Sequence, residues 1–240
     1  MIPISKPVTG QEEIKAMEKV FATGWLGLGS TVFDFEEAIK GYLGAKHVIA
    51  VNTGTSALHI ALAGWGVGPG DEVILPSITF AACVQAVLAL GAVPVFAESH
   101  EEDLLLDMDD VEKRLTKKTK AVMPVHYCGS PCDLERLNAL AAKHGFVVIE
   151  DAAHAFGSDY QGRKMGTHSH AACFSFDPIK NITCGEGGAV VLSDDKVAED
   201  IRRLRILGID KDTWHRYKNT RTYFYEVVSP GFRYHMPNFC

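Results

Sequence analysis

Short, continuously apolar runs alternate with longer segments of helical periodicity from residue 47 onward. Strands that are buried on both faces of a sheet read as such runs, and amphipathic helices repeat apolar residues every three or four positions. The pattern predicts buried strands at residues 47–51, 72–75, 93–96, 120–126 and 146–151 and helices at residues 56–65, 81–90, 108–115 and 134–144. This alternation places the chain in the α/β class, with a mainly parallel sheet and crossover helices.

Two further apolar runs, at residues 171–176 and 188–192, are separated by a glycine-rich turn that is too short for a crossover helix. Antiparallel strands can be joined by a tight turn, whereas parallel strands need a long connection. We therefore predict that this pair is antiparallel and that the three-layer fold contains a mixed, mostly parallel sheet. An amphipathic helix is expected at residues 196–207, and a polar, loop-like stretch follows at residues 210–222.

The N-terminal part of the chain has the pattern of two helices, at residues 11–21 and 31–42, joined by a glycine-rich loop. We expect these helices to lie outside the sheet. The chain then divides into an N-terminal helical segment, residues 1–45, that packs on a large domain formed by residues 46–240.

Composition narrows the class of protein further. The 240 residues carry 24 Lys and Arg against 30 Asp and Glu, a net charge of −6, and 47% of them are hydrophobic. A chain of this kind folds as a soluble globular protein, and its acidic balance offers no general attraction for nucleic acid. It has no apolar stretch long enough to span a membrane. Its six cysteines do not form two C-x-x-C pairs, so we expect reduced thiols in a cytoplasmic protein.

The first candidate for chemistry is the Asn-Thr-Gly-Thr-Ser segment at residues 52–56, between a predicted strand and a predicted helix. Free backbone N–H groups at a helix N-terminus and the helix dipole favour an anion there. Gly54 lets the backbone approach closely, and the hydroxyls of Thr55 and Ser56 add donors. The same residues also suit a simple helix N-cap. The segment lacks the lysine of a P-loop and the glycine spacing of a dinucleotide-binding motif, which argues against ATP and NAD.

The second candidate is Asp151, which follows the apolar run at residues 146–149. Open α/β sheets bind ligands at the carboxyl ends of their strands, where this residue is expected to lie. An unpaired buried carboxylate is costly, so Asp151 needs a partner. That partner is either an arginine of this chain or a protonated heterocycle. His154, three residues further on, suits a ligand site or simple packing.

The third candidate is Lys180, which stands between a predicted strand and the glycine-rich turn at residues 185–188. On its own it reads as a solvated loop residue, but apolar Pro178 and Ile179 are expected to crowd the approach to it. An amine that attacks a carbonyl is activated by desolvation. Together, an anion site, a buried acid and a lysine match the phosphate, the pyridinium nitrogen and the aldehyde of pyridoxal phosphate.

Five motifs that span the chain carry a family resemblance. They lie at residues 52–58, 76–80, 150–155, 175–180 and 185–188. With them the chain resembles the large domain of the DegT-like nucleotide-sugar aminotransferases, pyridoxal-phosphate enzymes with the aspartate-aminotransferase fold, which is fold type I of the transferases that use this cofactor. The resemblance implies that Lys180 binds the cofactor aldehyde covalently and that Asp151 keeps the ring nitrogen protonated.

The resemblance also implies further contacts to the cofactor. Phe80 is expected to stack on the ring face, and His154 to lie near the ring hydroxyl. The phosphate is expected at the N-terminus that begins near Gly54, held by Thr55, Ser56 and Ser175.

The substrates implied by the resemblance are a nucleotide-linked keto sugar and glutamate as amino donor. Residues 124–127 and 129–131 are most similar to those of enzymes that aminate C4 of UDP-linked or related sugars. Members are homodimers with shared sites, and Arg233 stands where an asparagine from the neighbouring subunit is usual, so it is expected to bind phosphate. Members continue into a small C-terminal domain, so we expect residues 1–240 to be a truncated chain.

Three alternatives remain at this point. Related sugar dehydratases remove a hydroxyl group, but they carry a histidine in place of Lys180. A non-catalytic or regulatory protein on the same scaffold is the second alternative. The third is a metal site at Cys128, Cys132 and His126, which lacks a fourth ligand, so we expect no metal.

Overall fold

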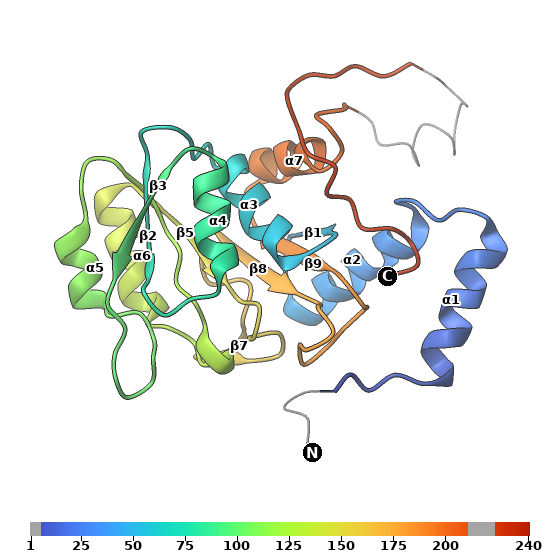
Figure 1. Cartoon of the computed structure of the whole chain (residues 1–240), viewed down its shortest axis with the longest axis horizontal. Coiled ribbons are helices and arrows are strands. Elements are labelled where there is room, and N and C mark those ends of the chain that lie inside the picture. Colours follow the sequence, from blue (N-terminus) through green and yellow to red (C-terminus); the bar gives the residue numbers. More distant parts are fainter. Residues whose placement is uncertain (1–5, 211–223) are drawn as a thin grey trace.

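A seven-stranded sheet forms the centre of the protein (Figure 1). The structure is a computed structural model that describes residues 6–210 and 224–240. Across the sheet the strands follow the order β1 (His47–Val51), β9 (Gly188–Leu192), β8 (Ala171–Ser175), β5 (Val147–Asp151), β4 (Thr119–Val122), β2 (Glu72–Pro76) and β3 (Val93–Ala97). Neighbours from β8 to β3 are parallel, whereas β9 runs antiparallel to β1 and β8. The predicted mixed, mostly parallel sheet is confirmed, as is the antiparallel pair.

Helices cover both faces of this sheet, which gives three layers (Figure 1). One face carries α3 (Gly54–Gly64), α4 (Ala81–Ala89) and α7 (Asp195–Leu204). The other face carries α2 (Ser30–Leu43), α5 (Met108–Arg114) and α6 (Leu134–His144). Helix α1 (Gln11–Thr23) precedes α2, and a 3₁₀ turn, η1 (Tyr127–Gly129), follows β4.

The core consists of two apolar layers, one on each side of the sheet. Successive side chains of a strand enter opposite layers, so that Val148 of β5 packs on the α6 side and Ile149 on the α3 side. Both side chains are fully buried, and burial of each contributes about 1.5–3 kcal/mol. This packing fixes β5 in the middle of the sheet and therefore fixes the position of Asp151 at its end.

Helix α2 is joined to the sheet by a buried ion pair as well as by apolar packing. Glu36 of α2 bonds the guanidinium of Arg205 and accepts a hydrogen bond from the N–H of Ala50 at 2.8 Å. Arg205 also donates to the carbonyl of Ala50 at 2.9 Å. Helix α1, by contrast, stands away from the sheet (Figure 1), and Val20 is its buried residue. The second N-terminal helix thus packs directly on the sheet and the first does not.

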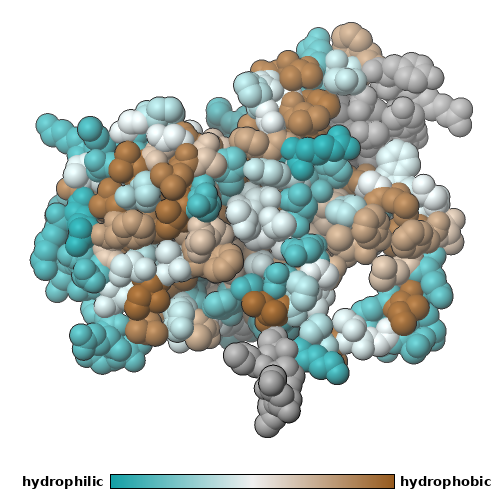
Figure 2. All heavy atoms as spheres, viewed as in Figure 1, coloured by the Kyte–Doolittle hydropathy of each residue, from teal (hydrophilic) through white to brown (hydrophobic). Residues whose placement is uncertain are grey.

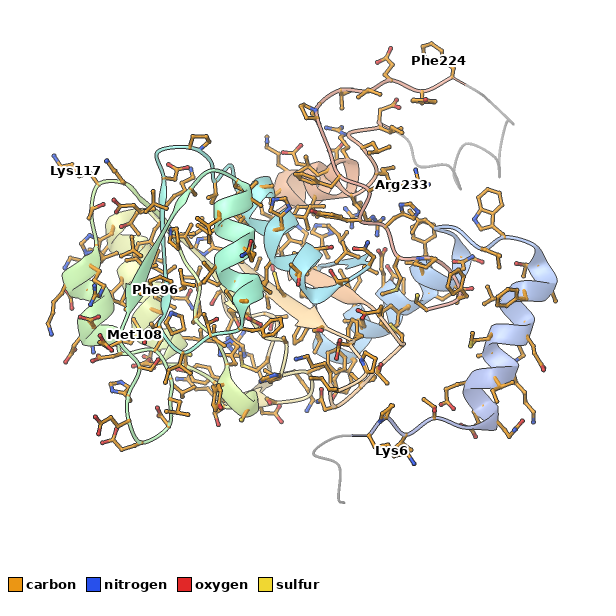
Figure 3. The ribbon with its side chains drawn as sticks, viewed as in Figure 1. Lys6, Phe96, Met108, Lys117, Phe224 and Arg233 are labelled. Atoms are coloured by element: carbon orange, nitrogen blue, oxygen red, sulfur yellow. The ribbon has the colours of Figure 1, made fainter. Side chains whose placement is uncertain are left out.

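The prediction that residues 93–96 are a buried strand is wrong. Strand β3 lies at the edge of the sheet, with β2 as its neighbour, and its Val93 and Phe96 side chains are exposed. Phe96 is labelled in Figure 3, and Figure 2 shows hydrophobic residues on this part of the surface. Pro94 suits an edge position because it has no N–H to donate to a further strand. Composition alone did not distinguish an apolar edge strand from a central one.

The strand predicted at residues 120–126 is shorter, because β4 ends at Val122. Pro124 lacks an N–H and interrupts the ladder. The chain nevertheless continues beside β5, since the Pro124 carbonyl accepts from the N–H of Asp151 at 2.9 Å and the N–H of His126 donates to the Asp151 carbonyl at 3.1 Å. These bonds bring His126 next to the end of β5.

Two further differences concern the chain after β5. The pattern did not reveal a hairpin of β6 (Asp159–Tyr160) and β7 (Arg163–Lys164), whose two turn residues both have positive φ. The helix predicted to reach residue 207 ends at Leu204, where Arg205 turns toward its buried partner. Residues 211–222 of the predicted polar loop lie outside the described residues. Within the described ranges, no helix is both long and apolar enough to cross a membrane.

Candidate active site

A cavity of about 560 Å³ opens at the carboxyl ends of β5 and β8, beside the N-termini of α3 and α4. All but two of the candidate residues line this cavity. The residues that line it are Gly54, Thr55, Phe80, Asp151, His154, Ser175 and Lys180. The two exceptions are Ser56 and Arg233. The sheet therefore brings together residues from motifs that are far apart in sequence, from Gly54 to Lys180.

The N-terminus of α3 forms one corner of the cavity. Thr53 is its N-cap, and the Thr53 side chain accepts a hydrogen bond from the N–H of Ser56 at 3.0 Å. The Ser56 hydroxyl donates to the side chain of Asn52 at 2.7 Å, so it braces the loop and does not face the cavity. Thr55 is exposed at this corner. The first N–H groups of a helix have no intrahelical acceptor, so this corner suits an anion, as the sequence predicts.

Two glycines allow this corner to close tightly on the neighbouring strands. A Cβ on Gly54 would lie 2.8 Å from Cβ of Ser175, and a Cβ on Gly188 would lie 2.4 Å from the carbonyl oxygen of Thr53. Because neither glycine has a side chain, the Ser175 hydroxyl lies beside the free N–H groups of α3. Backbone and hydroxyl donors that converge in this way fit a phosphate group.

Asp151 lies deep in the cavity and is 5% exposed. Its Oδ1 accepts from the N–H of Ala153 at 3.0 Å, and its Oδ2 accepts from the thiol of Cys83 at 2.9 Å. No described arginine forms an ion pair with it, so the first of the two predicted partners is not present among the described residues. The other predicted partner, a protonated heterocycle, remains a prediction. A carboxylate held in this way can still accept from a ligand, because each oxygen has two lone pairs.

Lys180 is held by a turn that follows β8. Its N–H donates to the Asp177 carbonyl at 3.0 Å, and the N–H of Ile179 donates to the Asp177 side chain, also at 3.0 Å. The Lys180 side chain is half-buried and forms no ion pair with any described residue. Ile179 lines the same cavity as Lys180 and is 66% exposed, so the expected crowding of the approach by this neighbour stays a prediction. The amine is thus free to meet a ligand in the cavity.

His154 lies between these charged groups, although its side chain is exposed overall. Partial burial and the positive charge of Lys180 lower the pKa of His154, and the negative charge of Asp151 acts in the opposite direction. A lowered pKa favours the neutral imidazole near pH 7. The neutral ring can donate or accept one hydrogen bond beside a ligand.

A buried pair of His126 and Glu150 lies next to Asp151 and was not predicted. Nε2 of His126 lies 3.0 Å from a carboxylate oxygen of Glu150, and its Nδ1 accepts from the N–H of Cys132 at 3.2 Å. His126 lines the cavity, and Glu150 precedes Asp151 on β5. The pair joins the segment after β4 to the end of β5. The sequence held no local signal for this pair, because His126 and Glu150 are 24 positions apart and meet only in the fold.

Arg233 lines a different cavity, of about 350 Å³, together with Trp25 and His235. It lies in the C-terminal segment, and in Figure 3 it is seen between α7 and the N-terminal helices. Arg233 pairs with Ile206 in a short antiparallel bridge. Within one copy of the chain, this residue is therefore not part of the 560 Å³ cavity.

The sheet with its helical layers is an α/β scaffold whose cavity joins an anion corner, a buried carboxylate and an unpaired lysine. Comparison with known proteins gives the family. The DegT/DnrJ/EryC1/StrS aminotransferase family matches residues 7–240, so the chain belongs to this family. The resemblance found in the sequence is confirmed.

The similar proteins are longer than this chain. It is 42% identical over 235 residues to the spore coat polysaccharide biosynthesis protein SpsC of Bacillus subtilis (strain 168), a match that covers 98% of the chain and 60% of SpsC. PseC of Helicobacter pylori, an aminotransferase involved in the biosynthesis of pseudoaminic acid, has 33% identity and a TM-score of 0.90, over 99% of this chain and 62% of PseC. The PLP-form of Spr1654 from Streptococcus pneumoniae has 28% identity and a TM-score of 0.90, over 99% and 64% of the two chains. The chain spans about three fifths of the length of these relatives.

Proposed function

We propose that this protein transfers an amino group to a nucleotide-linked keto sugar, with pyridoxal phosphate as cofactor and glutamate as amino donor. The observation that carries the proposal is the opening of Lys180, Asp151 and the α3 N-terminus into one cavity. The family supports amino transfer, and the names of SpsC and PseC support a sugar substrate. The PLP-form of Spr1654 supports the cofactor. Free thiols in the chain support a cytoplasmic enzyme.

The donor set of the cavity fits the cofactor group by group. The N–H groups at the start of α3 and the hydroxyls of Thr55 and Ser175 would hold the phosphate, and Asp151 would bind the ring nitrogen. Phe80, the 75% exposed N-cap of α4, lines the cavity and would cover a ring face. His154 would meet the ring hydroxyl. When bound, pyridoxal phosphate supplies a ring that withdraws electrons from the carbon next to the amino nitrogen.

Two side chains of this protein carry the proton chemistry. Lys180 would hold the aldehyde end of the cofactor, and its amine would move a proton between the α-carbon of the donor and the C4′ atom. An unpaired amine within reach of the cavity suits this role as a base. Asp151 keeps a proton on the ring nitrogen, because a buried carboxylate stabilises a neighbouring positive charge more strongly than an exposed one does.

A second copy of the chain completes the proposed site. Arg233 lies outside the cavity of its own copy, on a separate pocket with Trp25 and His235. We assign it to the phosphate of the partner's cofactor in a homodimer, a role for which a guanidinium provides several donors. Lys180 in the chain also favours amino transfer over the related dehydration, in which a histidine takes the place of the lysine.

Measurement of amino transfer tests the proposal directly. The protein is mixed with pyridoxal phosphate, glutamate and a UDP-linked 4-keto sugar, and formation of 2-oxoglutarate and amino sugar is followed. We expect both products from the parent protein and neither from Lys180→Ala. The matched control is Lys196→Ala, which removes an exposed lysine paired with Asp200 on α7, and it should leave the rate unchanged. Equal rates in Lys180→Ala and the parent, or no transfer by the parent, would contradict the proposal.

A further inference from the structure

A buried thiol meets the carboxylate of Asp151 from helix α4. Cys83 has no exposed surface, and its Sγ lies 2.9 Å from Oδ2 of Asp151. The other carboxylate oxygen accepts from the N–H of Ala153 at 3.0 Å. Each oxygen of Asp151 therefore has one donor from the protein. The donor to Oδ2 comes from α4, and the donor to Oδ1 comes from the backbone after β5. The two donors fix the orientation of the carboxylate plane.

The proton of this pair belongs to the sulfur. Burial raises the pKa of the Cys83 thiol far above its usual range, and the negative charge of Asp151 raises it further. A thiolate here would place two negative charges within 2.9 Å of each other. Cys83 therefore remains an S–H group that donates, and Asp151 remains the acceptor.

The other titratable groups that line the cavity with Asp151 are His126, Tyr127, His154, Cys173, Asp177, Lys180 and Glu186. Cys173 of β8 is buried beside it, and the charges of Asp151 and Glu150 raise its pKa after the larger effect of burial. His154 follows β5 and is affected by both Asp151 and Lys180. Unlike Cys83, Cys173 has no side-chain hydrogen bond to any described residue. Cys83 is thus the thiol that acts on Asp151 through a hydrogen bond.

We propose that Cys83 is a positioning residue that keeps the Asp151 carboxylate turned into the cavity, where it can bond the ring nitrogen of the cofactor. A carboxylate that faces the ring nitrogen stabilises the protonated ring through a charge-assisted hydrogen bond. Without the thiol, Oδ2 of Asp151 loses its donor, the carboxylate can turn away, and the proton on the ring nitrogen is held less strongly. This role rests on the proposed function, because it assumes that pyridoxal phosphate occupies the cavity.

Nitrogen NMR of isotope-labelled pyridoxal phosphate tests the role, because the shift of the ring nitrogen reports its protonation without any turnover. In Cys83→Ala we expect the protonation equilibrium of the ring nitrogen to weaken about three- to tenfold, which lowers its pH midpoint by about 0.5–1 unit. Cys83→Ser keeps a donor and should restore the parent midpoint. Cys173→Ala removes a buried sulfur from the same cavity without removing a hydrogen bond, and it should leave the midpoint unchanged. Equal midpoints in Cys83→Ala and the parent, or an equal shift in Cys173→Ala, would overturn the role.

A second measurement separates this role from the proposed function. The infrared S–H stretch of Cys83 is identified in the cofactor-free protein as the band lost in Cys83→Ala. We expect Asp151→Ala to move it to higher frequency, because the hydrogen bond is lost; a band that does not move would refute the contact. If the parent binds no pyridoxal phosphate, the proposed function and the role of Cys83 are both refuted. If the parent binds it and Cys83→Ala leaves the pH midpoint of the ring nitrogen unchanged, only the role of Cys83 is refuted.

Discussion

Replacement of Gly188 by alanine tests how tightly the anion corner is built. Gly188 begins β9, opposite Ser175 of β8, and lies against the loop that caps α3. An added Cβ would lie 2.4 Å from the carbonyl oxygen of Thr53 and 2.8 Å from the nitrogen of Gly54. Ordinary contacts of a Cβ begin near 3.4 Å, so the backbone must separate by about 1 Å. The three atoms nearest to the new Cβ all belong to the backbone, so no flexible side chain can move aside to relieve the contact.

The expected change in the free energy of unfolding of Gly188→Ala is the sum of three contributions. Overpacking of a closed site costs about 1–3 kcal/mol. Displacement of the Thr53 cap from its bond to Ser56 costs up to about 1 kcal/mol more. Alanine also has less conformational entropy than glycine in the unfolded chain, which stabilises the folded state by about 0.5–1 kcal/mol. We therefore expect Gly188→Ala to lower the free energy of unfolding by about 1–3 kcal/mol, and to lower the melting temperature by several degrees in a chain of this size.

Urea unfolding, followed by circular dichroism, measures this change. Gly68→Ala is the matched control, because a Cβ at Gly68 meets nothing within 4 Å and its φ is not in the left-handed region. Affinity for pyridoxal phosphate should also fall in Gly188→Ala, since the corner that would hold the phosphate is forced open. Equal urea midpoints for Gly188→Ala and Gly68→Ala would show that the corner is not tightly closed.

Two further predictions concern stability. Glu36→Ala leaves the guanidinium of Arg205 buried without its partner, which should lower the free energy of unfolding in urea by about 3–5 kcal/mol. Glu36→Gln keeps an acceptor and should lower it less. Equal urea midpoints for the parent and Glu36→Ala would argue against the ion pair. Burial lowers the pKa of His59, so the unfolded chain takes up a proton near pH 6.5 that the folded chain binds only at lower pH. Stability should therefore fall as pH falls below about 6.5, and His59→Phe should reduce that slope; an identical slope in both proteins would remove His59 as a cause.

The order of strands and helices could be predicted because apolar runs and turn residues are local signals. The turn before Gly188 was short enough to require an antiparallel pair, and β5 was apolar enough to be predicted as a buried strand. The edge position of β3 could not be predicted, because its neighbours are set by contacts across the whole sheet. The early end of β4 had a local signal in Pro124, but the apolar residues around it masked that signal.

The anion corner, Asp151 and Lys180 could be predicted from their places after strands, because the ends of these strands meet at one edge of the sheet. Phe80 and Ser175 were predicted from the family resemblance alone. Ser56 differs, since its hydroxyl is bonded to Asn52 and does not line the cavity. The contact of Cys83 with Asp151 could not be predicted, because the two residues are 68 positions apart and a cysteine in an apolar helix reads as ordinary packing. Long-range pairs of this kind become visible only when the fold places α4 over the end of β5.

The covalent attachment of the cofactor is the most direct test of the account. The protein is incubated with pyridoxal phosphate, reduced with borohydride and digested, and mass spectrometry then locates the modified peptide. We predict a visible absorption band before reduction and a reduced cofactor on Lys180, with both lost in Lys180→Ala and both kept in Lys196→Ala. A reduced cofactor found on another lysine, or a band that persists in Lys180→Ala, would contradict the claim that this amine binds the aldehyde.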